Sequence, residues 1–256
     1  MRTYLHVKRF DCAFGGLMAK EIWRPGNMLY PAPPVMVSCG REGEKPNIIT
    51  VAWAGTICSD PAMLSISVRK ERFSHSIIKE TGEFVVNLTS SKLAYAADWC
   101  GVRSGRDYDK FKEMKLTPLQ SQKISAPGIA EAPVNIECKV KQILELGTHD
   151  MFIAEVVSVS VDDKLLDDTG RLDLGKAGLV AYSHGEYYSL GEKLGKFGYS
   201  VARKHSQGQK KTADKQGTKR VNTGFGDKKK AEKSSVTNKT GANKKSSVNK
   251  NKKRNK

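Results

Sequence analysis

The stretch of sequence that decides the fold is residues 46–88, which read PNIITVAWAGTICSDPAMLSISVRKERFSHSIIKETGEFVVNL. Within it, apolar and hydroxyl side chains alternate over 63–68, a pattern that predicts a strand with one buried and one exposed face. The mainly apolar runs 48–54 and 83–88 predict two further strands. A short helical pattern precedes the last of them, so the stretch combines three strands and one helix.

A cluster of positive charge directly follows the alternating strand. Arg69, Lys70 and Arg72 occupy the turn, and Ser74 is a good N-cap residue for the helix that comes next. The first turn of a helix presents free backbone N–H groups and the positive end of the helix dipole, which favour anions. The turn therefore predicts a site for a phosphate-sized anion beside the strand that carries Trp53.

The remaining sequence predicts mainly short strands. The run 35–39 is apolar, and buried and polar positions alternate over 134–140 and 157–161, which favours antiparallel pairing with one face exposed to water. One further helix is expected over 93–99, ended by Gly101. Few helices lie between strands, so a doubly wound parallel sheet is excluded and an all-β antiparallel barrel with a few short helices is favoured.

Several function classes are excluded by motifs that the sequence lacks. It has no G-x-G-x-x-G between a strand and a helix and no G-x-x-x-x-G-K-[ST], so neither a Rossmann dinucleotide site nor a P-loop is expected. The five cysteines are scattered and never form C-x-x-C, which argues against a disulfide framework and a zinc site, and no metal is expected. Without a signal peptide or an apolar run of membrane-spanning length, a cytoplasmic protein with no membrane span is predicted.

Charge divides the chain unevenly. Residues 203–256 hold 19 of the 44 basic residues and 3 of the 27 acidic ones, and they contain no Leu, Ile, Met, Trp or Tyr. This tail therefore carries nearly all of the net charge of +17, while the rest of the chain is almost neutral. A segment so polar and so charged cannot bury enough apolar surface to offset the entropy of ordering it, so a disordered tail is predicted.

Two interpretations of the lysine-rich tail stay open. It is either a solvated extension that improves solubility or an electrostatic contact for nucleic acid, ribosomes or an anionic surface. Phe225 is its only aromatic residue for stacking on bases, so any polyanion binding is expected to be non-specific and strongly salt-dependent.

Six blocks of sequence, in order, resemble the flavin reductase-like family and most closely its flavoredoxin branch. The resemblance covers roughly 24–202, so 1–23 is interpreted as an extension or an upstream start. It implies a six-stranded split β-barrel with Greek-key topology that dimerises and holds FMN near the subunit interface, with electrons passing between NADH, NADPH or a protein donor and flavin or a further acceptor. The blocks are PNIITVAW, SVRKERFSH, GEFVVNL, CGVRSGRDYDKF, GTHDMFIAEV and GLVAYSHGEYYSLGEKLGKFG.

The resemblance also implies which residues contact the phosphate end of FMN. Ser74, Arg69 and Lys70 are expected to hold the phosphate. Arginine can form two parallel hydrogen bonds to phosphate oxygens, whereas lysine acts as a point charge. Asn47 and Trp53 are expected to lie against the flavin from the second strand.

Five further residues are implied to surround the flavin ring. Main-chain groups of Thr50 and Ala52 are expected near its polar edge, and Tyr182 over or beside it. Lys110 is expected near N1 and the C2 carbonyl, where a cation favours the reduced form. His149 is expected close to the ring and is the one candidate for a catalytic role.

Each of these residues also has a structural explanation that stays open at this point. Trp53 suits an apolar core, Lys110 suits a surface ion pair with neighbouring carboxylates, and His149 suits a turn. Two alternative functions are an FMN-storage or carrier protein without turnover, and a nucleic-acid-associated protein in which the barrel is a scaffold.

Overall fold

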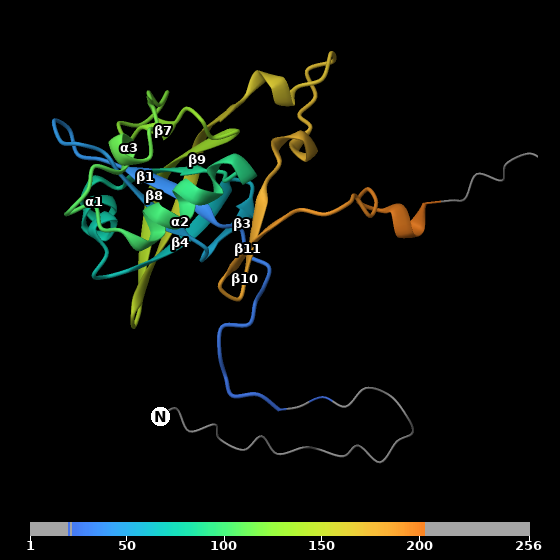
Figure 1. The fold of residues 1–256 in the computed structure, drawn as a ribbon, viewed down its shortest axis with the longest axis horizontal. Coiled ribbons are helices and arrows are strands. Elements are labelled where there is room, and N and C mark those ends of the chain that lie inside the picture. The colour runs from blue at the N-terminus through green and yellow to red at the C-terminus, as the bar shows by residue number, and fades with distance from the viewer. Residues whose placement is uncertain (1–19, 21, 203–256) are drawn as a thin grey trace, which may run out of the picture. The chain divides into compact units, whose positions relative to one another are not determined.

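The computed structural model describes residues 20 and 22–202 (Figure 1). Of these described residues, those up to Gly195 belong to one compact unit and 196–202 to another. The predicted disorder of residues 203–256, and most of the extension 1–23, lie outside the described residues. Within the described part of the chain, no helix combines the length and apolar character needed to cross a membrane.

A single seven-stranded antiparallel sheet forms the body of the protein (Figure 1). Its spatial order, β2-β1-β5-β8-β9-β4-β3, brings together strands that are distant in sequence, such as β1 with β5 and β4 with β9, as a Greek key does. The expectation of an all-β antiparallel fold is therefore confirmed. The strands are β1 (Val35–Cys39), β2 (Asn47–Val51), β3 (Ala54–Ser59), β4 (Ala62–Arg69), β5 (Glu83–Asn87), β8 (Val134–Leu146) and β9 (His149–Val161).

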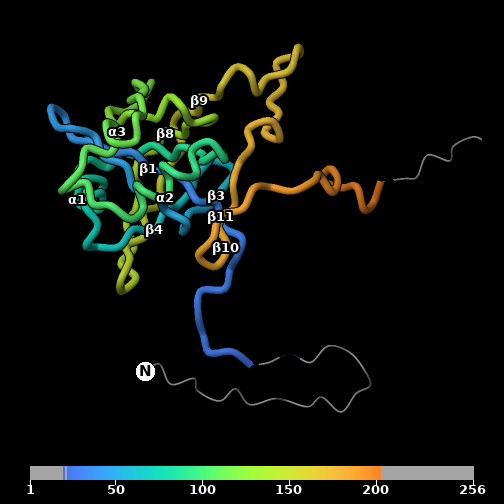
Figure 2. Tube along the Cα trace, in the orientation of Figure 1, coloured from blue at the N-terminus to red at the C-terminus, as the bar shows by residue number. Residues whose placement is uncertain are grey.

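The two edge strands of this sheet are consecutive in the chain, which makes the sheet curl. Only Ala52 and Trp53 separate β2 from β3, although the two strands lie at opposite ends of the spatial order. The backbone N–H of Ser67 in β4 donates to the carbonyl of Trp53 at 2.8 Å, which continues the β3–β4 ladder into the bend. The tube in Figure 2 follows this curled path. The sheet is thus a split barrel, and one run bent at Trp53 supplies two of its seven strands, where six were expected.

The helices differ from the predicted ones at their ends. The first begins at Phe73 with Arg72 as its N-cap and no side-chain cap, so the prediction that Ser74 caps it is wrong. The second continues through Gly101 to Val102, so the prediction that Gly101 ends it is wrong; a Cβ atom on Gly101 would lie 3.2 Å from Thr50 Cβ, so the glycine allows close packing against β2. The helices are α1 (Phe73–Thr81), α2 (Ala94–Val102) and α3 (Lys110–Glu113), with 3-10 turns η1 (Ser91–Leu93), η2 (Asp163–Leu165), η3 (Leu174–Ala177) and η4 (Tyr199–Val201).

Two short hairpins complete the fold. β10 (Val180–Ser183) pairs with β11 (Glu186–Ser189), and β6 (Pro118–Leu119) pairs with β7 (Gly128–Ile129). Backbone hydrogen bonds in both directions between Ala32 and Tyr182 join the first of these hairpins to the segment before β1. This contact places the aromatic side chains of the hairpin near β2.

Strand β1 is buried on both faces, and this divides the core into two clusters. Val37 points into the cluster that holds Ile66, Phe84 and Phe152, whereas Met36 points into the cluster beneath α2. Each buried apolar side chain of this size contributes about 1.5–3 kcal/mol. Helix α2 therefore covers one face of β1 and β2, and the site described below lies along β2.

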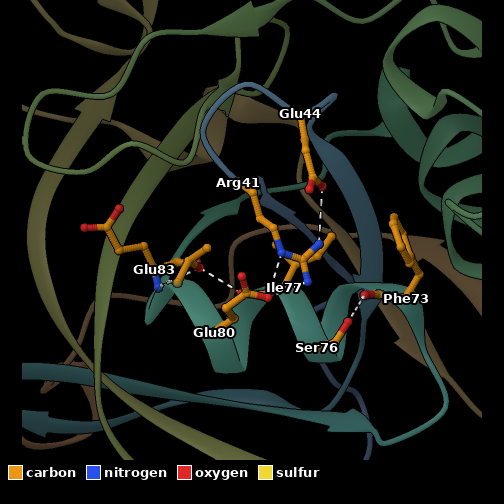
Figure 3. Close-up of polar contacts among 8 residues, drawn as sticks. Arg41, Glu44, Phe73, Ser76, Ile77, Glu80 and Glu83 are labelled. Carbon is orange, nitrogen blue, oxygen red and sulfur yellow. Dashed lines mark hydrogen bonds and ion pairs between the residues drawn. The ribbon is translucent and has the colours of Figure 1, made fainter.

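A surface network attaches α1 to the turn between β1 and β2 (Figure 3). The guanidinium of Arg41 lies 2.7 Å from Glu80 of the helix and 3.3 Å from Glu44 of the turn. In the first helical turn, the hydroxyl of Ser76 donates to the carbonyl of Phe73 at 3.2 Å. The exposed ion pairs are individually weak, but together they hold the C-terminal end of α1 beside the β1–β2 turn.

Candidate functional site

Two adjoining pockets lie along β2. The first has a volume of about 230 Å³ and the second of about 390 Å³. Ile49, Arg69 and Arg72 line both of them, so the two form one continuous cleft. We call the first the basic pocket and the second the aromatic pocket, after the side chains that line them.

The basic pocket carries a large excess of positive charge. It lies between the β4–α1 turn and the loop that joins α2 to α3, and Glu71 is its one carboxylate. Its net side-chain charge is therefore +4 when every lysine and arginine is protonated. Such a pocket favours an anionic ligand. Its five cations are Arg69, Arg72, Arg103, Arg106 and Lys110.

Asn47 and Ser74 form the floor of the basic pocket and are 3% and 1% exposed. The Asn47 amide nitrogen donates to the Ser74 hydroxyl at 2.7 Å, while its Oδ1 is buried and has no hydrogen-bond partner among the described residues. A phosphate ester with neighbouring hydroxyl groups fits this floor. A hydroxyl of such a ligand can donate to Oδ1. After a 180° rotation of the amide, a phosphate oxygen can instead accept from Nδ2.

Gly105 covers this floor at very short range. A Cβ atom at this position would lie 2.6 Å from Asn47 Cγ and 2.7 Å from Phe73 Cδ1, closer than real Cβ contacts. The α2–α3 loop thus approaches the Asn47 amide only because residue 105 is glycine. The absent side chain leaves the backbone of the loop as part of the pocket wall.

Lys110 is buried beneath the basic pocket. Its Nζ donates to the carbonyls of Ile48 and Cys100, both at 2.7 Å, and the side chain is 3% exposed. Burial lowers the pKa of Lys110 to about 8, opposed by Cys100 and reinforced by Arg72. The alternative of a surface ion pair is wrong, because the ammonium is inside. The structure places Lys110 in the basic pocket and not among the residues that line the aromatic pocket, where the ring was expected.

The three cations of the β4–α1 turn point in different directions. Arg69 and Arg72 line both pockets, and Arg69 Nε pairs with Glu71 at 2.7 Å. Lys70 lines neither pocket, and its Nζ lies 3.3 Å from both Glu145 and Asp150. Successive side chains at the end of a strand project to opposite faces, which places Lys70 away from Arg69. Arg72, and not Lys70, therefore joins Arg69 in lining the pocket where the phosphate was expected.

Two cations of the basic pocket were not predicted. Arg103 and Arg106 belong to the loop after α2, in the R-S-G-R sequence that the resemblance includes. Neither lies on a strand or helix with a regular hydrophobic pattern. A turn with two arginines around Ser-Gly was the available signal.

Aromatic side chains from three segments line the second pocket. Trp53 comes from the β2–β3 bend, Tyr182 and Tyr187 from the β10–β11 hairpin, and Tyr30 from the segment before β1. The Tyr30 ring lies 6.3 Å from that of Trp53 and 6.1 Å from that of Tyr182. Trp53 is only partly buried, so it both packs against the core and lines the cleft. The pocket suits a flat aromatic ligand.

The polar groups of the aromatic pocket come from β2, α2 and β9. Thr50 lines it from β2 and Ala52 from the bend that follows, with the Thr50 hydroxyl donating to the Ala97 carbonyl at 2.5 Å. His149 lines it from the start of β9, opposite Arg69 in the strand register. Burial, and then the charge of Arg69, lowers the pKa of His149, so its ring is neutral at pH 7. Its Nδ1 lies 2.9 Å from the Thr148 hydroxyl.

The structure thus brings together every predicted site residue except Lys70, at the two ends of one cleft. Tyr30 and Tyr187 were missed, since neither lies in a pattern that distinguishes a site from a surface. The basic end gathers Asn47, Arg69, Ser74 and Lys110, and the aromatic end gathers Thr50, Ala52, Trp53, His149 and Tyr182.

Known proteins are similar to this chain in both sequence and fold. A model of the flavin reductase like domain matches residues 27–191. The flavoredoxin of Desulfovibrio vulgaris (Miyazaki F) is 34% identical with a TM-score of 0.67, over 72% of this chain and 100% of that one. The flavoredoxin from Methanosarcina acetivorans is 27% identical with a TM-score of 0.64, over the same shares of the two chains. A NADPH-flavin oxidoreductase of Streptomyces viridifaciens is 24% identical over 48% of this chain and 63% of that protein.

Proposed function

Because the chain belongs to the flavin reductase-like family, we propose that it is an FMN-binding oxidoreductase that moves electrons between a reduced donor and a downstream acceptor. The observation that carries the proposal is the continuous cleft, with an anion-binding end and an aromatic end that share Ile49, Arg69 and Arg72. FMN has the matching asymmetry, a flat ring system joined to a phosphate by a polyhydroxylated chain. The donor is NADH, NADPH or a reduced protein.

In this proposal the basic pocket holds the phosphate. Ser74, Arg69 and Arg72 would bind its oxygens, and Asn47 would bind a phosphate oxygen or a hydroxyl of the chain. Lys110 adds a buried positive charge beneath them. Its ammonium is also held by two backbone carbonyls, so it cannot move out to solvent without leaving both unpaired.

The aromatic pocket would hold the ring. Trp53, Tyr30 and Tyr182 exclude water from it, and the backbone of Thr50 and Ala52 lies along the same pocket. His149, neutral at pH 7, can exchange a hydrogen bond with a polar atom of the ring without adding charge. When bound, the flavin supplies the electron transfer, whereas the protein orients it and tunes its potential.

Purified full-length protein tests the proposal directly. It should be yellow, release FMN as identified by mass, and be bleached by at least one reduced donor in stopped-flow measurements. If a nicotinamide is the donor, bleaching by NADH or NADPH should be faster than for free FMN under the same conditions. A protein that binds FMN but is reduced no faster than the free cofactor by any donor would instead be a storage or carrier protein. A colourless protein that cannot be loaded with FMN would refute the flavin proposal.

We further propose a homodimer located in the cytoplasm. Support for the dimer comes from large apolar side chains exposed before β1: Ile22, Trp23, Met28 and Leu29 are all more than half exposed. Light scattering should give twice the mass of the chain, and a monomer at micromolar concentration would refute the dimer.

Polyanion contact through residues 203–256 is a separate proposal, supported by their charge. Deleting them should abolish binding to DNA at low salt while leaving FMN binding unchanged. Equal DNA binding by the shortened and full-length proteins would refute this role.

A further inference from the structure

The basic pocket has more positive charge than one phosphate can neutralise. Its net side-chain charge is +4, whereas a phosphate monoester brings at most about −2 at pH 7. About two positive charges are left over. We infer that Arg103 and Arg106 form a second anion subsite at the outer wall of this pocket, which binds a phosphate group of a dinucleotide electron donor. This inference rests on the proposed function, since it takes the inner floor as the flavin phosphate site.

Neither of these arginines is neutralised within the protein. Among the residues that the structure describes, no carboxylate lies within 4.0 Å of Arg103 or Arg106, whereas Arg69 pairs with Glu71 at 2.7 Å in the same pocket. A guanidinium is always charged and offers five N–H donors. Two such groups without an acidic partner on one pocket wall leave most of their donors for a ligand.

Both guanidinium groups are nevertheless held in place. Arg106 donates from Nη1 to the Glu71 carbonyl at 3.1 Å and lies 5.6 Å from the centre of the Phe73 ring. It therefore bridges the α2–α3 loop and the β4–α1 turn across the pocket. The hydrogen bond and the attraction to the aromatic face restrict the guanidinium, so less entropy is lost when a phosphate binds.

Arg103 is fixed in a similar way on the loop itself. Its guanidinium carbon lies 5.7 Å from the centre of the Tyr108 ring, and that ring packs edge-on against Trp99 with centres 5.4 Å apart. The two arginines are thus oriented before any ligand arrives. This differs from a solvated arginine run, in which the side chains have no such supports.

Burial separates the second subsite from the floor of the pocket. Asn47, Ser74 and Lys110 are buried, whereas Arg103 and Arg106 are exposed on the loop above them. A ligand whose ring fills the aromatic pocket reaches the floor with its own phosphate. A second nucleotide that arrives from solvent would meet the exposed pair first.

Two phosphate groups of a nicotinamide donor fit this chemistry, and they predict different selectivity. If the pair binds the 2′-phosphate, NADPH is the preferred donor and NADH is insensitive to the two arginines. If it binds the diphosphate, both donors depend on them equally. The compounds 2′,5′-ADP and ADP carry these groups without the nicotinamide, so they probe the subsite without any electron transfer.

Calorimetric binding of 2′,5′-ADP and ADP to the full-length protein, with and without FMN, tests the inference at about 0.15 M salt, which screens the distant lysines. Arg103→Gln and Arg106→Gln should each weaken binding of the preferred probe about tenfold, as expected for the loss of a charge-assisted hydrogen bond at a partly exposed site. Arg103→Lys and Arg106→Lys should lose less, because the charge is kept. FMN affinity should fall less than probe affinity, since the flavin phosphate binds at the floor and the exposed pair lies above it. The matched control is Arg171→Gln, which removes the same charge from an exposed loop outside both pockets.

Several results would overturn the inference. They are equal probe binding by R103Q, R106Q and the unchanged protein, an equal loss in R171Q, or a loss of FMN affinity as large as that of the probe. Probe binding to protein free of FMN separates the failure of this inference from the failure of the proposed function. If FMN is not bound at all but R103Q and R106Q still weaken 2′,5′-ADP or ADP, the proposed function fails and the subsite stands.

Discussion

Replacing Gly105 by alanine tests how the floor of the basic pocket is built. Gly105 has no positive φ angle, so alanine is compatible with its backbone and the effect of the change is steric. The added methyl group would lie 2.6 Å from Asn47 Cγ and 2.7 Å from Phe73 Cδ1. Asn47 Oδ1 would be closer still, and ordinary van der Waals contact begins near 3.4 Å, so the loop or the Asn47 side chain must move by more than 1 Å.

The cost can be worked from these contacts. Overpacking of a tight contact costs about 1–3 kcal/mol. If the Asn47 amide moves, its hydrogen bond to Ser74 is also lost, which adds about 1 kcal/mol. We therefore expect G105A to lower the free energy of unfolding by about 2 kcal/mol. FMN affinity should fall at least about tenfold, because the distorted amide no longer meets the ligand.

A double-mutant cycle identifies Asn47 as the obstacle. In N47A protein the nearest obstacle is gone and the contact with Phe73 remains, so adding G105A should cost less than it costs alone. The matched control is G55A, a glycine-to-alanine change on β3 where no atom lies within 4 Å of the new methyl group. Urea unfolding of protein without FMN and fluorescence titration with FMN measure the two effects separately.

The reasoning is refuted if G105A binds FMN and unfolds like the unchanged protein. It is also refuted if the effects of N47A and G105A are additive, since the methyl group would then be hindered elsewhere. A G55A variant as damaged as G105A would point to a general effect of alanine on the chain.

Three further predictions concern the same cleft and its support. Raising the pH through about 8 should weaken FMN binding, because Lys110 loses its charge there, and K110R should remove this step in a titration of affinity against pH. W53L should lower FMN affinity about tenfold through the loss of ring packing, measured by flavin fluorescence. D150N should lower the free energy of unfolding in urea by about 2 kcal/mol at pH 7, because it weakens the 2.8 Å contact with His75. Burial opposes ionisation of Asp150, but His75 and Lys70 outweigh it and lower its pKa. The contribution of ionised Asp150 to the free energy of unfolding is therefore present above pH 3.8 and is lost as the pH falls through the lowered pKa. D150N should lack that loss at acid pH.

Local patterns predicted the strands that have one wet face, but not the full sheet. The alternation over 63–68 identified β4, whereas β3 was missed because most of its residues are exposed and it begins with Ala-Gly. Strands β8 and β9 extend to 13 residues each, well beyond their alternating halves, because they pair with each other up to the turn at Gly147. That pairing is a tertiary contact that no local pattern records.

The site was predictable where the resemblance named residues and where local charge indicated a phosphate. Charge alone did not show that Lys70 and Arg72, two positions apart, face different partners. Nor did the capping preference of Ser74 show that its hydroxyl meets Asn47, which lies 27 positions earlier in the sequence. These facts depend on the packing of α1 against β2, so only the three-dimensional structure supplies them.

Trp53, at the bend between β2 and β3, takes part in both the sheet and the cleft. Its carbonyl accepts the hydrogen bond from Ser67 at the end of the β3–β4 ladder, and its ring lines the aromatic pocket. The end of a ladder opens at lower energy than its middle, and a ligand bound beside it raises the free energy of opening. The amide hydrogen of Ser67 should therefore exchange with solvent more slowly when the cleft is occupied, so its exchange rate reports the fraction of protein with an empty cleft.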